Sequence, residues 1–268
     1  MPDLFLPFTH LVSAGLAGAH HTLTAAGLDP HGGLTWALAI AGLVVAVRLA
    51  LLPLVVHGVR LGRTSAAARP ALAELRGRYA DRTDLESLRA LRAEQRRIQG
   101  EHGVPALGCL PLLLQLPILF ALYRVLSDVA GGHTVGAMDA ALVASAGSAS
   151  LLGVHLAERL GGASPGHLAL IAATATVAAL LAYVTQRCFA LPNTVLDGLP
   201  EQVADVQRLM PAVSALGVLL AAGAVPFGLL VYWVASNAWA LGQQAVITAW
   251  FPTPGSAAHA ARAARRAC

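Results

Sequence analysis

One arginine lies inside a long apolar segment near the start of the chain. Arg48 is the only charged residue between Leu34 and Val56. A guanidinium at the centre of a bilayer costs at least about 2.5 kcal/mol, so such a residue requires water or a polar partner. A fixed cation in a poorly solvated place attracts carboxylates. Arg48 therefore indicates either a polar cavity within the membrane or an anchor that reaches the membrane surface.

Polar residues at helical spacing in other apolar segments could share a cavity with this cation. Trp233 and Asn237 stand four residues apart, and Gln244 and Thr248 continue the same stripe seven and eleven residues after Asn237. Gln115 lies in another apolar segment, between two prolines. Such side chains often only bridge membrane helices. Because no Asp or Glu occurs in these segments, we favour the shared cavity.

The composition places the whole chain in the membrane. Hydrophobic residues make up 56% of the sequence and charged residues 12%, with a mean hydropathy of +0.64. A soluble domain has about twice that share of charge. The three cysteines are widely separated, so we expect free thiols and no metal site. No hydrolase or nucleotide-binding motif occurs, so we expect neither a catalytic residue nor a cofactor, and no enzymatic activity.

Apolar windows predict an all-α integral membrane protein with five transmembrane helices. The block at 208–251 is too long for one helix, and Gly223–Pro226 gives the turn within it. The predicted segments, in chain order, are an amino-terminal segment with an interfacial or disordered stretch (1–33), a first span (34–57), a basic helical hairpin (58–105), a second span (106–127), a loop with a possible short helix (128–166), a third span (167–187), a loop (188–207), the fourth and fifth spans (208–251) and a basic tail (252–268).

The distribution of arginine orients these spans. Ten arginines lie between the first two spans and three in the tail, whereas 128–166 contains only Arg159. By the positive-inside rule, the hairpin and the carboxyl terminus are cytoplasmic and the amino terminus is outside. The location expected is the plasma membrane of a bacterial cell.

Two amphipathic helices are predicted in the hairpin. Apolar residues repeat at spacings of three and four on either side of a break near Gly77 and Asp81. Thr83 and Glu86 have the spacing of a capping box for the second helix. The arginines could form a mobile basic paddle, a solvated charged face that only fixes topology, or a surface attracted to anionic lipids.

Several stretches together resemble the YidC family of membrane protein insertases, in its short single-domain bacterial form. The most specific is Gly-Cys-Leu-Pro-Leu-Leu-Leu-Gln-Leu-Pro-Ile-Leu-Phe-Ala-Leu-Tyr, at 108–123. The others are 47–53, 72–79 and 228–237, the last followed by the Gln pair at 243–244. The third span matches only by position and by Gln186-Arg187.

The resemblance implies a hydrophilic groove that opens to the cytoplasm, with Arg48 as its lone charge. Tyr232 and Trp233 match the aromatic pair past which client helices slide. The expected substrate-binding set is Arg48, Gln115, Tyr232, Trp233, Asn237 and Gln244. The implied partners are nascent membrane proteins with short acidic translocated tails, membrane lipids and, in some cases, the Sec translocon and the ribosome; no DNA partner is expected.

Three functions compete at this point. The leading hypothesis is a membrane protein insertase and chaperone that acts alone or with the Sec translocon. The second is an anion or small-solute channel in which Arg48 selects the ion, and the third is a non-catalytic factor that holds subunits of membrane complexes. Only the insertase and the channel require the charge of Arg48.

Overall fold

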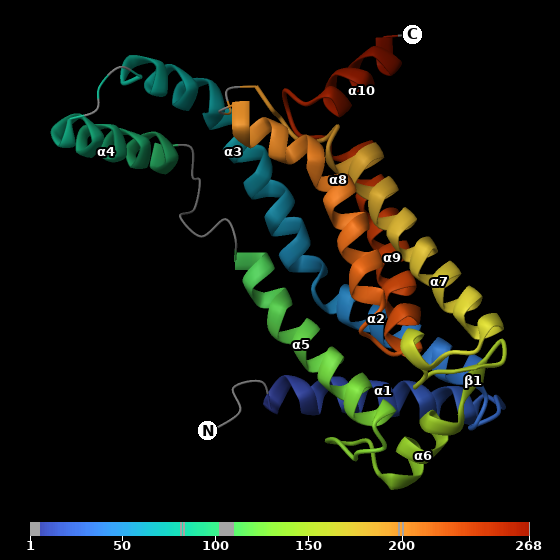
Figure 1. The fold of residues 1–268 in the computed structure, drawn as a ribbon. Helices are drawn as coiled ribbons and strands as arrows, with labels where there is room; N and C mark the ends of the chain where they lie inside the picture. Colours follow the sequence, from blue (N-terminus) through green and yellow to red (C-terminus); the bar gives the residue numbers. More distant parts are fainter. Residues whose placement is uncertain are drawn as a thin grey trace. The chain divides into compact units, whose positions relative to one another are not determined.

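The computed structural model describes residues 6–80, 82, 84–101, 110–197, 199 and 201–267. Within these residues the chain forms ten α-helices, a short 3₁₀-helix, a π-helix and one two-stranded hairpin (Figure 1). The chain divides into two compact units, each built from three separate stretches of sequence. The helical content confirms the predicted all-α class, with the two-residue strands as a small departure.

The first unit comprises Met1–Leu51, Leu112–Tyr183 and Ala212–Leu241. Its elements are α1 (Leu6–Ala25), α2 (Gly33–Ala50), most of α5 (Leu110–Ala130), α6 (Ala140–Ser148), β1 (Ser150–Leu151), β2 (Val154–His155), η1 (Leu160–Gly162), most of α7 (Pro165–Val184), the end of α8 (Glu201–Ala222) and the start of α9 (Phe227–Trp250). Its core includes the fully buried Trp36, Ile40, Val125 and Leu230.

Helix α1 packs on α2 through a regular stripe. Its buried residues, spaced by three and one as one helical face requires, are Thr9, Val12, Ser13, Leu16, Ala17 and His20. The helix ends in a Schellman motif, in which Leu28 N–H donates to the Leu23 carbonyl. Gly27 supplies the left-handed residue, with φ of +97°. Of the two sequence-based alternatives for this stretch, the structure shows the helix.

The predicted first span, 34–57, is divided at Leu51. Helix α2 ends at Ala50, and α3 begins at Leu52. The break follows from Pro53, which has no N–H to donate and whose ring clashes with the carbonyl four residues earlier. The prediction of one apolar span over 34–57 did not include this break between two helices.

The segment 128–166, predicted as a loop with a possible short helix, is held together by regular structure. It contains α6 and a hairpin in which Ser150 pairs with His155 and Leu151 with Val154. The segment then holds the start of α9, because Phe227 N–H donates to the Glu158 carbonyl at 2.8 Å. Gly228 N–H likewise donates to the Leu156 carbonyl. Two N–H groups that have no partner within the helix are therefore bonded to this segment.

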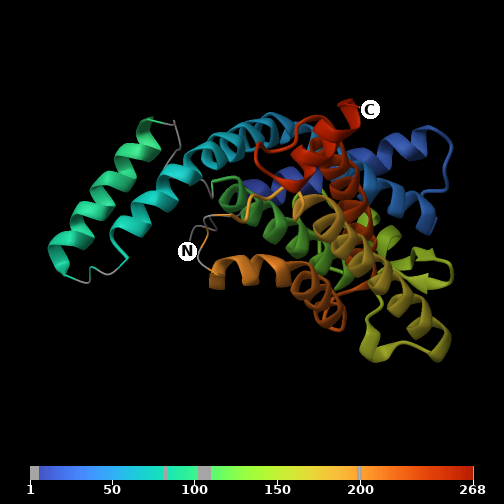
Figure 2. The same cartoon turned by 90° about the horizontal axis from the view of Figure 1, so that it is seen from above.

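The second unit comprises Leu52–Pro111, Val184–Pro211 and Gly242–Cys268. Its elements are α3 (Leu52–Arg78), α4 (Leu85–Glu101), the π-helix η2 (Thr185–Ala190), the start of α8, the end of α9 and α10 (Ala257–Ala267). Figures 1 and 2 both show α3 and α4 side by side as a hairpin. The hairpin closes over a small core of Ala68, Leu75 and Ile98.

The turn of this hairpin differs in detail from its prediction. Helix α3 runs through Gly77 to Arg78, because a solvent-facing glycine is tolerated within a helix. Asp81 and Thr83 lie outside the described residues. The start of α4 is capped by Asp84, whose carboxylate accepts from Ser87 N–H at 2.8 Å.

Three described helices are long and apolar enough to cross a membrane: Gly33–Ala50, Pro165–Ala190 and Glu201–Ala222. They correspond to the predicted first, third and fourth spans. The predicted turn at Gly223–Pro226 is confirmed, since α8 ends at Ala222 and α9 begins at Phe227. The chain is therefore a helical protein with membrane-spanning segments.

Candidate functional site

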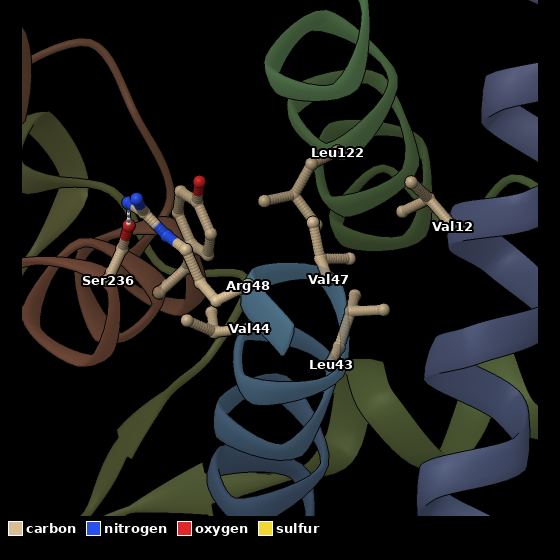
Figure 3. Close-up of a pocket in the computed structure, with 8 residues that line it drawn as sticks. Val12, Leu43, Val44, Val47, Arg48, Leu122 and Ser236 are labelled. Atoms are coloured by element: carbon tan, nitrogen blue, oxygen red, sulfur yellow. Dashed lines mark hydrogen bonds between the residues drawn. The ribbon is translucent and has the colours of Figure 1, made fainter. Parts of the chain in front are cut away.

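A small cavity surrounds Arg48 inside the first unit. Four helices of this unit contribute to it: α1, α2, α5 and α9. Its lining residues are Val12, Leu43, Val44, Val47, Arg48, Leu122, Tyr232 and Ser236. Five of the eight are aliphatic, so the wall is apolar except where Arg48 meets the two polar residues of α9 (Figure 3).

Arg48 is held by a neutral partner. Its Nη2 donates to the hydroxyl of Ser236 at 2.9 Å (Figure 3). Ser236 is 9% exposed, whereas Arg48 is half-buried. No carboxylate contacts Arg48 within the described part of the chain. The guanidinium therefore keeps its charge uncompensated while one donor is satisfied.

Tyr232 shares this cavity with Arg48. It lies one helical turn before Ser236 on α9, so the two side chains occupy one face of that helix. Tyr232 is only 8% exposed. The structure thus brings together two residues of the predicted set, and the tyrosine forms a wall of the cavity.

The cavity is the size of a water site. About 20 Å³ is open to the centres of water molecules. A cavity needs roughly 10–15 Å³ by this measure to hold one water, together with two or more polar partners. Arg48, Ser236 and Tyr232 supply those partners, so a hydrated guanidinium fits this space.

Two other predicted residues lie on α9 but do not line the cavity. Trp233 is half-buried and packs against the core of the first unit. Asn237 donates from Nδ2 to the Trp233 carbonyl at 2.8 Å, a contact within one helix. Their side chains serve packing and a local hydrogen bond in this structure.

The remaining two predicted residues lie elsewhere in the described elements. Gln244 is half-buried on the part of α9 that belongs to the second unit. Gln115 lies on α5, and its side chain is outside the described part of the structure. Their role in client binding stays a prediction.

Sequence reasoning missed Ser236 as the partner of Arg48. The predicted stripe ran through Trp233 and Asn237, one position away from the face that carries Tyr232 and Ser236. A serine four residues after a predicted site tyrosine was the available signal, because residues four apart share a helix face.

Among the described residues, no group of three or more His, Cys, Asp or Glu side chains is placed to hold a metal ion. Cys188 is a free, exposed cysteine, and Cys109 and Cys268 lie outside the described residues. The cavity around Arg48 offers donors for an anion instead.

Comparison with known proteins identifies the family. Residues 28–254 match the family described as 60Kd inner membrane protein. The chain belongs to the 60Kd inner membrane protein family. The match includes the elements that carry Arg48, Tyr232 and Ser236.

Relatives in this family are named membrane protein insertase YidC. The protein from Streptomyces avermitilis is 32% identical over 244 residues, which cover 85% of this chain and 55% of the relative. Relatives from Tropheryma whipplei (strain Twist) and Bifidobacterium longum are each 27% identical and cover 99% and 90% of this chain. This chain spans 90% of the Tropheryma protein and 74% of the Bifidobacterium protein. The family is thus one of bacterial membrane protein insertases.

Proposed function

We propose that this protein inserts hydrophobic polypeptides into a bacterial cell membrane, with Arg48 as the charge that receives acidic parts of the client. The observation that carries the proposal is the pairing of Arg48 with a neutral hydroxyl, at 2.9 Å, in a largely apolar cavity. A structural arginine in an apolar site is normally neutralised by a carboxylate. Arg48 instead remains able to bind one. Membership of an insertase family supports this reading.

The mechanism is electrostatic and requires no nucleotide hydrolysis. As an acidic tail leaves bulk water, its attraction to the guanidinium increases, because the interaction energy of two opposite charges is larger at a lower dielectric constant. One water beside the guanidinium is exchanged for a carboxylate oxygen. The client's apolar segment then partitions into lipid, which favours the inserted state. Arg48 lowers the barrier for the polar part of the client.

The proposal includes five spans. Besides the three helices named above, α5 with 21 residues and α9 with 24 residues reach across about 30 Å of hydrocarbon at 1.5 Å per residue. Five spans place the termini on opposite sides. Because arginine is concentrated in 58–105 and in the tail, those parts face the cytoplasm and the amino terminus faces outward. The proposal also includes the hydrophilic groove, open to the cytoplasm, that the family resemblance implies, with Arg48 as its charge.

The proposed partners are client membrane proteins, membrane lipids, the Sec translocon and the ribosome. Clients are membrane proteins with short acidic translocated tails, because these tails match a single fixed cation. Contact with membrane lipids follows from the exposed apolar helices. Cooperation with the Sec translocon and contact with the ribosome are carried over from the family resemblance.

The test is insertion of a single-span client with an acidic amino-terminal tail into proteoliposomes that contain only this protein, read by protease protection. Arg48→Ala should reduce insertion by about tenfold, since an ion pair at intermediate dielectric contributes more than about 1 kcal/mol. Arg48→Lys should retain most activity. The matched control is Arg124→Gln, which removes an equally charged side chain from α5, where Arg124 faces Asp128 at 3.7 Å.

A second client with Asn and Gln in place of its acidic tail residues completes the design. Insertion of this neutral client should be equal in wild type and Arg48→Ala. Equal loss in Arg48→Ala for both clients would overturn the electrostatic role. Solute flux without any client would support the channel, and client binding without insertion would support the assembly factor.

A further inference from the structure

A basic pocket lies in the second unit, at the end of α9, and the insertase mechanism does not use it. About 330 Å³ of this pocket is open to the centres of water molecules. Its polar and aromatic lining residues are Arg63, Trp250, Phe251, His259, Arg262 and Arg266. No carboxylate lines it in the described part of the chain. The pocket therefore presents three permanent positive charges to one open volume.

Helix α10 places three of these residues by its periodicity. His259, Arg262 and Arg266 occur at spacings of three and four, which brings them onto one face. The intervening Arg265 faces a different groove, beside Cys188. The adjacent residues Arg265 and Arg266 therefore line different surfaces.

The pocket is held in place by hydrogen bonds on both sides. Arg262 donates to the carbonyl of Trp250, the last residue of α9. Ser256 is buried and its hydroxyl accepts from His259 N–H at 3.2 Å, which caps the start of α10. The Ala258 N–H donates to the Pro192 carbonyl at 2.9 Å. The basic face is therefore built on anchored backbone.

Two aromatic side chains form the apolar edge of the pocket. Trp250 is 63% exposed and Phe251 is 52% exposed. Both follow directly on the apolar helix α9, and aromatic residues at the ends of membrane helices lie at the level of the lipid headgroups. If α9 spans the membrane as proposed above, the three arginines lie at the depth of the lipid phosphates.

We infer that this pocket binds the phosphate headgroup of an anionic phospholipid. Guanidinium groups bind phosphate oxygens through paired N–H donors, and Arg63 and Arg266 approach the pocket from two different helices. Trp250 and Phe251 contact the glycerol and upper acyl region, which a soluble phosphate lacks. The lipid thereby fixes α10 to the membrane surface at the end of α9. This inference rests on the proposed membrane span, but binding is measured without insertion activity.

The experiment titrates dioctanoyl phosphatidylglycerol into the full-length protein in neutral detergent and counts bound lipid by native mass spectrometry. The test variant is Arg63→Gln/Arg266→Gln. The matched control is Arg60→Gln/Arg265→Gln, which removes the same charge from the same two helices but from residues outside the pocket. The single variant Arg266→Gln is measured as well. Arg266 is exposed, so this change should not disturb folding, and the test does not depend on the double variant alone.

The expected result is one tightly bound lipid whose affinity falls about tenfold in the test variant and by less than about twofold in the control, as loss of two close cations predicts. The single variant should fall between wild type and the double variant. Dioctanoyl phosphatidylcholine should bind more weakly, because its headgroup has no net charge.

Three results would overturn the inference. An equal loss in the test and control variants would mean a diffuse attraction to the basic surface. Displacement of the lipid by an equal concentration of inorganic phosphate would assign the pocket to a soluble anion. Tighter binding of a short RNA, with the same dependence on Arg63 and Arg266, would assign it to nucleic acid. Insertion of the acidic client should stay normal in the test variant, so failure here is distinct from failure of the insertase proposal.

Discussion

Arg48 and Ser236 join α2 to α9 through a single side-chain hydrogen bond of 2.9 Å, although 188 positions separate them in the sequence. A serine hydroxyl accepts a guanidinium N–H without carrying a negative charge of its own. The contact therefore positions the charge and leaves it available to a carboxylate.

A double-mutant cycle should measure this contact. We expect Ser236→Ala to destabilise the protein by about 1.5–3 kcal/mol, the range for a hydrogen bond to a charged group. In an Arg48→Ala background the same change should have almost no effect, because the donor is absent. Unfolding in detergent, followed by circular dichroism, gives the four free energies. Additive effects would show that the two side chains do not interact.

Ser236→Ala should also leave client insertion largely intact. The charge of Arg48 remains, and a client carboxylate replaces the lost acceptor. Insertion of the acidic client should therefore stay within about twofold of wild type, because the fixed charge that attracts the client carboxylate is unchanged. Protease protection in proteoliposomes measures it. A loss as large as that of Arg48→Ala would mean that the hydroxyl itself is required.

Gly33 should not tolerate a side chain. A Cβ at this position would lie 2.1 Å from the Ser150 carbonyl oxygen and 2.7 Å from Leu151 N. Both are backbone atoms of the short hairpin, so relief requires the hairpin to move. We expect Gly33→Ala to destabilise the protein by at least about 1–3 kcal/mol, as overpacking does.

Gly18→Ala is the matched control. Gly18 lies inside α1 in the same unit, and nothing lies within 4 Å of its hypothetical Cβ. Alanine should stabilise this helix by about 0.5–1 kcal/mol. Thermal unfolding of the two variants should move in opposite directions. A stable Gly33→Ala protein would show that the hairpin does not pack closely on the start of α2.

A buried polar network joins three parts of the first unit. Trp36 Nε1 donates to the Ser145 hydroxyl at 3.1 Å, and that hydroxyl donates to the Pro30 carbonyl at 2.6 Å. His20 stacks on Trp36 with ring centroids 4.2 Å apart, and its Nε2 also meets the Pro30 carbonyl. Ser145 is therefore both acceptor and donor in a site with little access to water.

Ser145→Ala should destabilise the protein by about 1–3 kcal/mol, because it leaves the Trp36 N–H buried without an acceptor. Ser148→Ala is the control, since Ser148 is exposed on the same helix and should change stability by less than about 0.5 kcal/mol. Unfolding followed by near-ultraviolet circular dichroism reports on the environment of Trp36. Equal stability of the two variants would contradict the network.

The parts of the fold that follow local rules were predictable from the sequence. The apolar runs predict α2, α7 and α8, and Gly223–Pro226 predicts the turn before α9. The end of α2 was equally local, since Pro53 stands two residues after the break, but the unbroken apolar pattern outweighed it. The hairpin at 150–155 was not predictable, because two-residue strands owe their stability to tertiary packing.

The candidate site also contains one residue that the sequence predicts and one contact that depends on tertiary packing. A charge within an apolar run is visible in the sequence, so Arg48 was predictable. The spacing of four places Ser236 on the same helical face as Tyr232, but its bond to Arg48 depends on which face of α9 meets α2, and packing across the first unit sets that rotation. Helical spacing gives faces but not the direction in which they point. Trp233 and Asn237 were therefore placed one position away from the observed contact.

Acid should weaken the start of α4 through Asp84. The Ser87 backbone N–H and then the Ser87 side chain bind the Asp84 carboxylate, and they hold its pKa below the usual value. Since the folded pKa is lower than that of the unfolded chain, the cap stabilises the helix fully above the unfolded pKa of about 3.9. The contribution is lost as the pH falls through the folded pKa. Below that pH the protonated carboxyl no longer attracts the N–H dipoles at the helix start.

Hydrogen exchange of the peptide 85–101 in wild type and Asp84→Ala measures this effect. At neutral pH the wild-type peptide should exchange more slowly, because Ala removes the acceptor for Ser87 N–H. The ratio of the two rates cancels the intrinsic effect of pH and should approach one in strong acid. Asp84→Asn keeps a neutral acceptor for Ser87 N–H. The exchange rate of this variant, divided by that of wild type, should therefore be smaller at neutral pH than the same ratio for Asp84→Ala. It should also change less as the pH falls. A ratio that does not change with pH would show that the carboxylate charge contributes nothing to the cap.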